Sequence, residues 1–241
     1  SHGKAIGAVV DRCPAGLSLC EEDIQVYLDR RKPGQSRYTT ARAEGDRVEI
    51  LSGVFEGKTT GTPISMIIWN KDQRSKDYGN LMEVYRPGHA DYTFDLKYGF
   101  RDYRGGGRSS GRETAGRVAA GAVASKFLES LGIRVRAYTS AIGDVSIDRS
   151  RFSWEEMEKN RLYMPDKEAA ERAEKLLDKR MSETDSAGGI VECVIMGMPV
   201  GVGEPVFEKL DACLAKAVMS IGAVKGVEIG DGFLAAASRG S

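Results

Sequence analysis

The chain of 241 residues is as long as one large domain or two small ones, and it is long enough to bury a full apolar core. Hydrophobic residues make up 41% of it and charged residues 29%, a composition that excludes general disorder. Its 35 basic side chains balance its 35 acidic ones, which excludes a strongly basic nucleic-acid binder unless the charge is unevenly spread.

No apolar run is long enough to cross a bilayer, and no secretory signal pattern is present. The four cysteines follow no metal-ligand spacing, which favours small buried thiols over disulfides. The chain opens without an initiator methionine, so its front end looks cut, and the tail at 236–241 looks cut as well. We expect a cytoplasmic protein without a membrane partner.

The first half predicts apolar strands around one helix. Strands are expected at 5–10, 48–51 and 64–69, where short apolar runs end at glycine or proline. The tetrapeptide Ser-Leu-Cys-Glu at 18–21 matches a capping box, which predicts a helix that ends before Pro33. No period is found from 70 to 112, so no regular element is expected there, and such long stretches are usually functional or disordered.

The second half repeats this pairing of strands with Ala-rich helices. A capping box at 110–113 predicts a helix to 131 whose small side chains allow close packing. A strand at 133–145, an amphipathic helix from Pro165, a β-rich run at 190–202 and a helix near 208–221 follow. This pattern indicates a layered α+β fold.

The two histidines, His2 and His89, both lie beside glycine in polar surroundings. Imidazole is the side chain best suited to proton transfer near neutral pH. A lone histidine is more often structural than catalytic, but neither of these lies on an apolar helical face. Both interpretations therefore stay open at this point.

Arginines gather in two polar, non-periodic segments, and Arg86 precedes His89. The two groups are Arg30, Arg31, Arg37 and Arg42, and Arg101, Arg104, Arg108 and Arg112. A solvated charged surface is the ordinary explanation of such groups. Guanidinium forks also bind phosphate and carboxylate, and the glycines between these arginines favour a site for an anion.

The sharpest local feature is Arg-Gly-Gly-Gly-Arg-Ser-Ser-Gly at 104–111, which runs into the predicted helix. Free backbone N–H groups at such a junction suit a phosphate. The dinucleotide fingerprint is absent, because Ser110 takes the place of its third glycine. The P-loop lysine is also missing, which disfavours an ATPase and leaves a phosphate-bearing cofactor or substrate.

Long motifs in chain order resemble those of chorismate synthase. They are Ser-His-Gly at 1–3, Asp-Arg-Arg-Lys-Pro-Gly-Gln-Ser-Arg at 29–37, Asp-Gln-Arg-Ser-Lys-Asp-Tyr at 72–78, Arg-Pro-Gly-His-Ala-Asp at 86–91, Tyr-Arg-Gly-Gly-Gly-Arg-Ser-Ser at 103–110, Asp-Ser-Ala-Gly-Gly at 185–189 and Val-Lys-Gly-Val-Glu-Ile-Gly-Asp-Gly-Phe at 224–233. The resemblance implies one domain over 1–241, truncated at both ends. Its implied fold is α+β, a helical core layered between antiparallel β-sheets, assembled as a homotetramer.

The resemblance also implies a reaction. It is the anti-1,4-elimination of phosphate from 5-enolpyruvylshikimate-3-phosphate to give chorismate, by a lyase that requires reduced FMN. This is the last common step of the shikimate pathway, which leads to the aromatic amino acids. A small phosphorylated substrate is thereby implied, without nucleic acid.

The matching motifs imply residue roles. His2 would protonate the leaving phosphate, and His89 would hold or protonate the flavin. The positions that match FMN contacts are Arg108, Ser109, Ser110, Gly222 and Ala223. The positions that match anion-binding arginines for the substrate are Arg31, Arg37 and Arg86. Arg31 and Arg37 also match positions linked to NADP in members that reduce their own flavin, which makes NADPH a second candidate cofactor.

Two departures limit this expectation. Gly222 stands where the family usually has asparagine, and the C-terminal part of the family, with further FMN contacts, is absent from the sequence. We therefore expect weak or no turnover from this chain. The alternatives are an anion- or RNA-binding module, against which the lack of an RNP-like aromatic motif counts, and a non-catalytic assembly fragment of the same fold.

Overall fold

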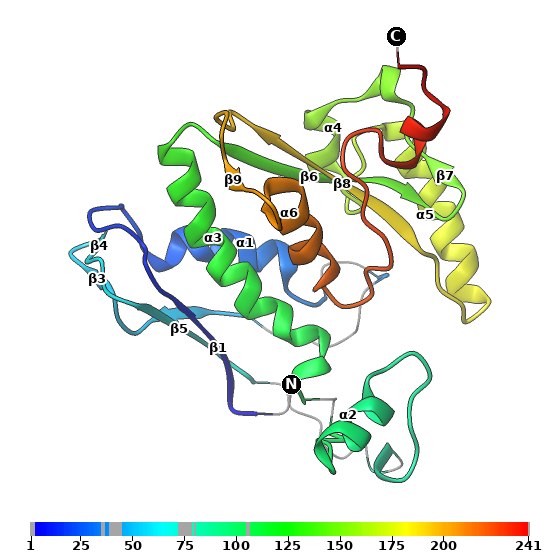
Figure 1. The fold of residues 1–241 in the computed structure, drawn as a ribbon. Coiled ribbons are helices and arrows are strands. Elements are labelled where there is room, and N and C mark those ends of the chain that lie inside the picture. The colour runs from blue at the N-terminus through cyan, green and yellow to red at the C-terminus, as the bar shows by residue number, and fades with distance from the viewer. Residues whose placement is uncertain are drawn as a thin grey trace.

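The computed structural model describes residues 3–34, 37–38, 45–71, 79, 81–104 and 107–240 (Figure 1). The strands are β1 (Ala5–Val10), β2 (Val48–Ile50), β3 (Val54–Phe55), β4 (Lys58–Thr59), β5 (Ile64–Trp69), β6 (Arg134–Ile142), β7 (Val145–Ser146), β8 (Gly189–Met196), β9 (Gly203–Glu204) and β10 (Glu208–Lys209). The α-helices are α1 (Glu21–Arg31), α2 (Asp91–Tyr98), α3 (Thr114–Ser130), α4 (Trp154–Lys159), α5 (Lys167–Ser182) and α6 (Leu210–Met219). Short 3-10 turns lie at Gly107–Ser109, Gly111–Glu113, Arg149–Arg151 and Gly232–Ala237.

The first sheet has the strand order β1-β5-β2, with antiparallel pairs throughout. Its core-facing side chains alternate along β5, where Ile64, Met66 and Ile68 are buried. They pack with the apolar faces of α1 and α3 in one continuous core. A Cβ at Gly116 of α3 would lie 3.1 Å from the carbonyl oxygen of Gly7 in β1, which is tighter than most Cβ contacts, so glycine suits this close packing of helix on strand.

The second sheet has the order β7-β6-β8, again antiparallel, with a bulge between Thr139 and Ala141. Helix α5 covers it with a stripe of buried alanines, and Asp166 caps the helix by accepting from the backbone N–H groups of Glu168 and Ala169. This start agrees with the predicted one.

Helices α1 and α3 lie between the two sheets (Figure 1). Helix α3 packs against α1 and β1 on one side and reaches β6 on the other. The predicted α+β architecture, a helical core between antiparallel sheets, is therefore confirmed. No helix in the described ranges is both long and apolar enough to span a membrane.

Several local predictions were wrong. The single strand expected over 133–145 is divided by a turn into β6 and β7, which pair antiparallel. Helix α2 forms inside the stretch expected to lack regular structure, with Gly99 in the left-handed conformation (φ 76°) as its C-cap. Helix α1 is capped at Cys20, whose backbone N–H donates to the Asp23 carboxylate at 2.9 Å, rather than by a box at 18–21. The four cysteines are free, as expected, but only Cys13 is buried.

Candidate active site at the start of β1 and α3

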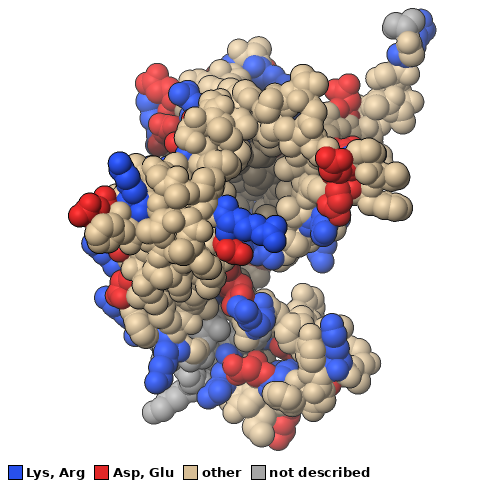
Figure 2. Space-filling view, turned by 60° about the vertical axis from the view of Figure 1, so that its left-hand side comes forward, with Lys and Arg blue, Asp and Glu red and all other residues tan. Residues whose placement is uncertain are grey.

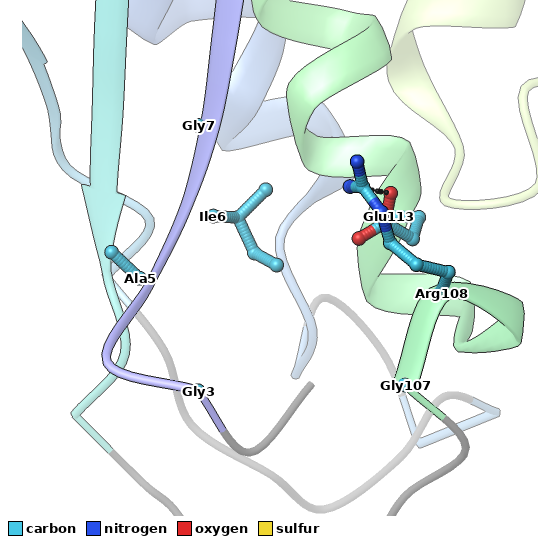
Figure 3. A pocket seen from close by; sticks show the side chains of 7 residues that line it. All are labelled: Gly3, Ala5, Ile6, Gly7, Gly107, Arg108 and Glu113. Atoms are coloured by element: carbon cyan, nitrogen blue, oxygen red, sulfur yellow. Dashed lines mark hydrogen bonds and ion pairs between the residues drawn. The ribbon is translucent and has the colours of Figure 1, made fainter. Parts of the chain in front are cut away.

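A cavity of about 240 Å³ lies between the start of β1 and the segment that leads into α3 (Figure 3). Its lining residues are Gly3, Ala5, Ile6, Gly7, Gly107, Arg108 and Glu113. The β1 side contributes glycines and small apolar groups, whereas the α3 side contributes the charged side chains. The glycine-rich segment singled out in the sequence therefore faces the N-terminal strand across a hollow.

Arg108 and Glu113 form an ion pair at this cavity, with 2.7 Å between Nη1 and Oε2. The Arg108 side chain is 83% exposed, so it is open to solvent apart from this contact. Glu113 was expected to close a capping box with Ser110, but its carboxylate is engaged by Arg108 instead. Ser110 still caps the segment, since its Oγ accepts from the Arg112 N–H at 3.2 Å, and residues 111–113 form a 3-10 turn before α3 begins.

A buried carboxylate ties α1 to the start of α3. Asp46 is 2% exposed and accepts from Arg31 Nη1 at 2.7 Å and from Arg112 Nη1 at 2.8 Å. Arg31 Nε also donates to Thr114 Oγ1 at 3.1 Å. Two guanidinium groups thus share one carboxylate, which leaves a net positive charge beside the N-terminal turn of α3.

One hydrogen-bond donor of the Arg112 side chain, Nη2, has no acceptor among the described residues. Its side chain is 4% exposed, and its Nε donates to Asn70 Oδ1 at 2.5 Å. Its buried Nη2 has no hydrogen-bond partner in the part of the chain that the structure describes. A buried guanidinium N–H without an acceptor is costly, so this atom is suited to meet an acceptor oxygen from a ligand.

A second cluster surrounds His89 at the start of α2. Asp91 is 2% exposed and accepts three hydrogen bonds from Arg86, at 3.0 Å from the backbone and 2.8 Å from both Nε and Nη2. These bonds, against the cost of burial, hold the pKa of the Asp91 carboxyl well below its usual range. His89 Nδ1 lies 2.9 Å from Asp91 Oδ1. Three residues of one short motif thereby form a single charged unit.

The turn after α6 is tied to α3. Arg117, one turn inside α3, donates from Nη1 to Ser220 Oγ at 2.7 Å and from Nη2 to the Ser220 carbonyl at 3.1 Å. Gly222 and Ala223 follow in a turn in which Ala223 adopts a positive φ of 72°. This link brings a segment about a hundred residues away to the end of α3 at which the cavity lies.

Arg37 joins a different part of the molecule. Its Nη2 lies 2.6 Å from Asp178 Oδ2 on α5, and the Tyr38 hydroxyl donates to the same carboxylate at 3.0 Å. The hydrogen bond with Tyr38, together with the negative charge of Asp178, raises the pKa of Arg37. No hydrogen bond or ion pair within the described residues connects Arg37 to Arg31 or Arg108.

The family model of chorismate synthase matches residues 1–241. The chain belongs to the chorismate synthase family. It is 66% identical over 240 residues to the chorismate synthase of Agathobacter rectalis and 64% identical over 240 residues to that of Lachnospira eligens. These alignments cover 100% of this chain but 65% and 66% of those relatives, so the chain spans just under two thirds of their length.

A solved structure described as "Crystal Structure of Chorismate Synthase" has the same fold, with a TM-score of 0.81 and 36% sequence identity. It is matched over 100% of this chain and 69% of its own length. The resemblance in the sequence motifs to the chorismate synthase family is therefore confirmed.

The structure places the residues singled out by the chorismate synthase motifs in several settings. Arg108 lines the cavity, Ser109 and Ser110 follow it in the same segment, and Arg31 lies at the adjoining end of α3. The turn of Gly222 and Ala223 is linked to α3. Arg86 and His89 form their own cluster, whereas Arg37 joins α5. His2 lies outside the described residues, although Gly3 next to it lines the cavity.

Sequence reasoning missed the acidic partners. It treated the arginines as free for an anion, but many of them are paired with carboxylates, among them Asp46, Asp91 and Glu113. Basic and acidic side chains are accordingly interspersed over the face in Figure 2 rather than segregated. A signal was present, because acidic residues lie within six positions of Arg86 and Arg108, but only the fold shows that Asp46 meets Arg31 and Arg112.

Proposed function

We propose that this chain carries the catalytic region of a chorismate synthase, a lyase that eliminates phosphate from 5-enolpyruvylshikimate-3-phosphate in the anti-1,4 sense. The observation that carries the proposal is the cavity lined by Arg108, next to two guanidinium groups that share the single carboxylate of Asp46. A net positive, partly buried site beside glycine backbone suits a substrate with several negative charges.

Reduced FMN is the cofactor that the family requires, and the residues present fit it. The orphaned Nη2 of Arg112 and the exposed edge of Arg108 both offer donors to anionic oxygens, and the glycines of the lining leave room for a flat ring. When bound, the flavin supplies electron density that weakens the carbon–oxygen bond of the leaving phosphate. Segment 108–110 and the turn at Gly222 and Ala223 would hold it.

The protein's own groups then bind, orient and move protons. Arg31 would hold substrate anion charge from its fixed place on Asp46. His89 would present Nε2 for hydrogen bonding or proton transfer, because its Nδ1 is hydrogen-bonded with Arg86 Nη2 at 3.1 Å and lies 2.9 Å from Asp91 Oδ1. His2 would donate a proton to the departing phosphate oxygen, which converts a poor leaving group into a better one.

Four further expectations from the family resemblance are part of this proposal. They are a role for NADPH at Arg31 and Arg37, a homotetramer, a cytoplasmic location and a single domain over residues 1–241. Support for the single domain comes from α3, which contacts both β1 and β6. The pairing of arginines with carboxylates supports a small anionic ligand over a nucleic acid, since it leaves less unbalanced positive surface.

The test is an anaerobic assay of chorismate formation with dithionite-reduced FMN, run on this chain beside the longer Agathobacter rectalis relative. We expect the chain to bind reduced FMN and substrate, with turnover below that of the relative. In the relative, the changes that align with His2→Ala and His89→Ala should lower turnover sharply. The change that aligns with Lys97→Ala should leave turnover unchanged, because Lys97 is exposed on α2.

A folded chain that binds neither flavin nor substrate would overturn the proposal. If that chain then bound RNA with a steep loss of affinity in salt, it would be an RNA-binding module. If it formed an oligomer without ligand, it would be an assembly fragment.

A further inference from the structure

We propose that Arg101 is a positioning residue for the cluster around His89. It joins the segment 81–84 to helix α2 and thereby sets the places of Arg86 and His89, which lie between the two along the chain. The use of Arg86 and His89 toward a substrate rests on the proposed function, but the order that Arg101 imposes on them does not.

On one side, the Arg101 guanidinium group is fixed to α2. Gly99 ends this helix in the left-handed conformation, and Arg101 follows two positions later. Its Nε donates to Asp95 Oδ2 at 3.0 Å, and its Nη1 lies 3.7 Å from Asp91 Oδ1, an ion pair without a hydrogen bond. The Arg101 side chain is 5% exposed, so water screens these charges little.

On the other side, the same group holds the backbone of segment 81–84. Arg101 Nη2 donates to the carbonyl oxygens of Leu81 at 2.6 Å, Met82 at 3.3 Å and Val84 at 3.0 Å. This segment belongs to none of the strands and α-helices, and α2 stands apart from both sheets in Figure 1. The Met82 and Val84 side chains are exposed, so apolar packing contributes little to the order of the segment. Its carbonyl groups need other donors, and Arg101 supplies them.

Arg86 comes two positions after Val84 and depends on this attachment. Its backbone N–H donates to Asp91 Oδ2 at 3.0 Å, and its Nε and Nη2 donate to the same carboxylate at 2.8 Å. Arg86 Nη2 is also hydrogen-bonded with His89 Nδ1 at 3.1 Å. Because Arg101 holds the chain just before Arg86 and the helix just after His89, a shift at Arg101 moves both side chains.

Exposure separates the positioning residue from the groups that a ligand reaches. The side chains of Arg86 and His89 are 26% and 23% exposed, whereas that of Arg101 is closed off from solvent. A guanidinium group suits this place, because its three nitrogens direct donors at α2 and at segment 81–84 together. A lysine has one nitrogen and would reach one side only. Arg101 therefore acts on a ligand through Arg86 and His89.

Amide exchange followed by NMR tests the attachment on this chain. The reporters are the backbone N–H groups of Arg86 and His89, which donate to Asp91 Oδ2 and to the Arg86 carbonyl oxygen. We expect Arg101→Gln and Arg101→Lys to lower the protection of both amides at least about tenfold. Lys97→Gln is the matched control and should leave it unchanged, because Lys97 is exposed on α2 and lies over the Tyr98 ring.

Unchanged protection of these two amides in a folded Arg101 variant would overturn the proposal. The unmodified chain gives a test that needs no variant. An Arg86 amide that exchanges there as fast as in an unfolded peptide would overturn the proposal as well.

A double-mutant cycle tests whether Arg101 acts through Arg86. Calorimetry measures the Kd of 5-enolpyruvylshikimate-3-phosphate for the unmodified chain, Arg101→Gln, Arg86→Gln and the double variant, and circular dichroism confirms that each is folded. We expect Arg101→Gln alone to weaken binding on the order of tenfold, and to add little once Arg86→Gln is present. An equal loss on both backgrounds would refute positioning, since a merely structural effect does not depend on Arg86.

The two measurements separate this inference from the proposed function. If the unmodified chain binds no substrate while the Arg86 and His89 amides still depend on Arg101, the proposed function alone is refuted.

Discussion

Two regions of the molecule are stabilised in opposite ways: the sheet β1-β5-β2 packed with α1 and α3, and the segment 81–104 around α2. In the first region, aliphatic side chains such as Ile24, Leu28 and Ile64 are completely buried. In the α2 segment the buried residue is Asp91, and large apolar side chains are exposed, among them Leu96 at 69% and Phe100 at 77%.

The contrast shows where each kind of order comes from. Apolar burial is non-directional and tolerates small shifts, so it suits a scaffold. Ion pairs and hydrogen bonds around a buried carboxylate are directional, so they suit the placement of an imidazole. Arg101 completes this frame by donating from Nη2 to the carbonyl oxygens of Leu81 and Val84 at 2.6 and 3.0 Å.

The largest expected effect comes from Asp91→Ala. It leaves Arg86 and Arg101 facing each other without their shared carboxylate, so the opening free energy of segment 81–104 should fall by about 4 kcal/mol. Amide exchange followed by mass spectrometry should show lost protection there and unchanged protection in β5 and α3. Equal loss in both regions would contradict the separate construction of the two.

Leu28→Ala should break the scaffold instead. Leu28 is 0% exposed, and its removal leaves a cavity in the core of α1, so the global free energy of unfolding should fall by about 3 kcal/mol. Urea unfolding monitored by circular dichroism measures it. Val26→Ala, 63% exposed on the same helix, should change stability by less than about 0.5 kcal/mol.

Low pH should weaken the regions that ion pairs stabilise more than the regions that apolar packing stabilises. Burial raises the pKa of Asp166, but hydrogen bonds from Arg151 and from the backbone outweigh it and lower that pKa to about 2. Because the folded pKa is depressed, this group stabilises the fold fully above its unfolded value and loses that contribution as the pH falls from about 4 to about 2. The contribution is about 2 kcal/mol.

Asp166→Asn should therefore be about 2 kcal/mol less stable at neutral pH, and this difference should vanish near pH 2. Urea midpoints measured across that range test it. Glu171→Gln, exposed on the same helix, is the matched control and should follow the unmodified protein at every pH. A difference that persists in strong acid would assign the loss to packing rather than to charge.

The smallest effect is expected at Ser110→Ala. The change removes the hydroxyl that accepts from the Arg112 N–H, so stability should fall by about 1 kcal/mol. Ser110→Thr retains the hydroxyl and should restore most of it. Thermal unfolding of the three proteins compares them, and no loss in the alanine protein would show that the cap is dispensable.

The hydrophobic periodicity of the sequence, with its capping, glycine and proline residues, was enough to predict the main elements of the scaffold. Strands at 5–10 and 64–69 appear with the predicted bounds, and α5 begins after the predicted cap, because alternation, helical spacing and capping are local properties. The motifs were also enough for the family. Helix α2 was not predicted, since no apolar stripe marks it and its order comes from a carboxylate inside a cluster of arginines.

By itself, then, the sequence determined the α+β class, the main strands and helices, the family and a set of arginines and histidines. Only the tertiary structure decided how these groups are partnered. Asp46 meets Arg31 and Arg112 across 15 and 66 positions, and Arg117 reaches Ser220 across 103. No local pattern encodes such pairs, because the distances between them are set by the packing of helices on sheets, and these pairs decide which guanidinium and imidazole atoms remain available to a ligand.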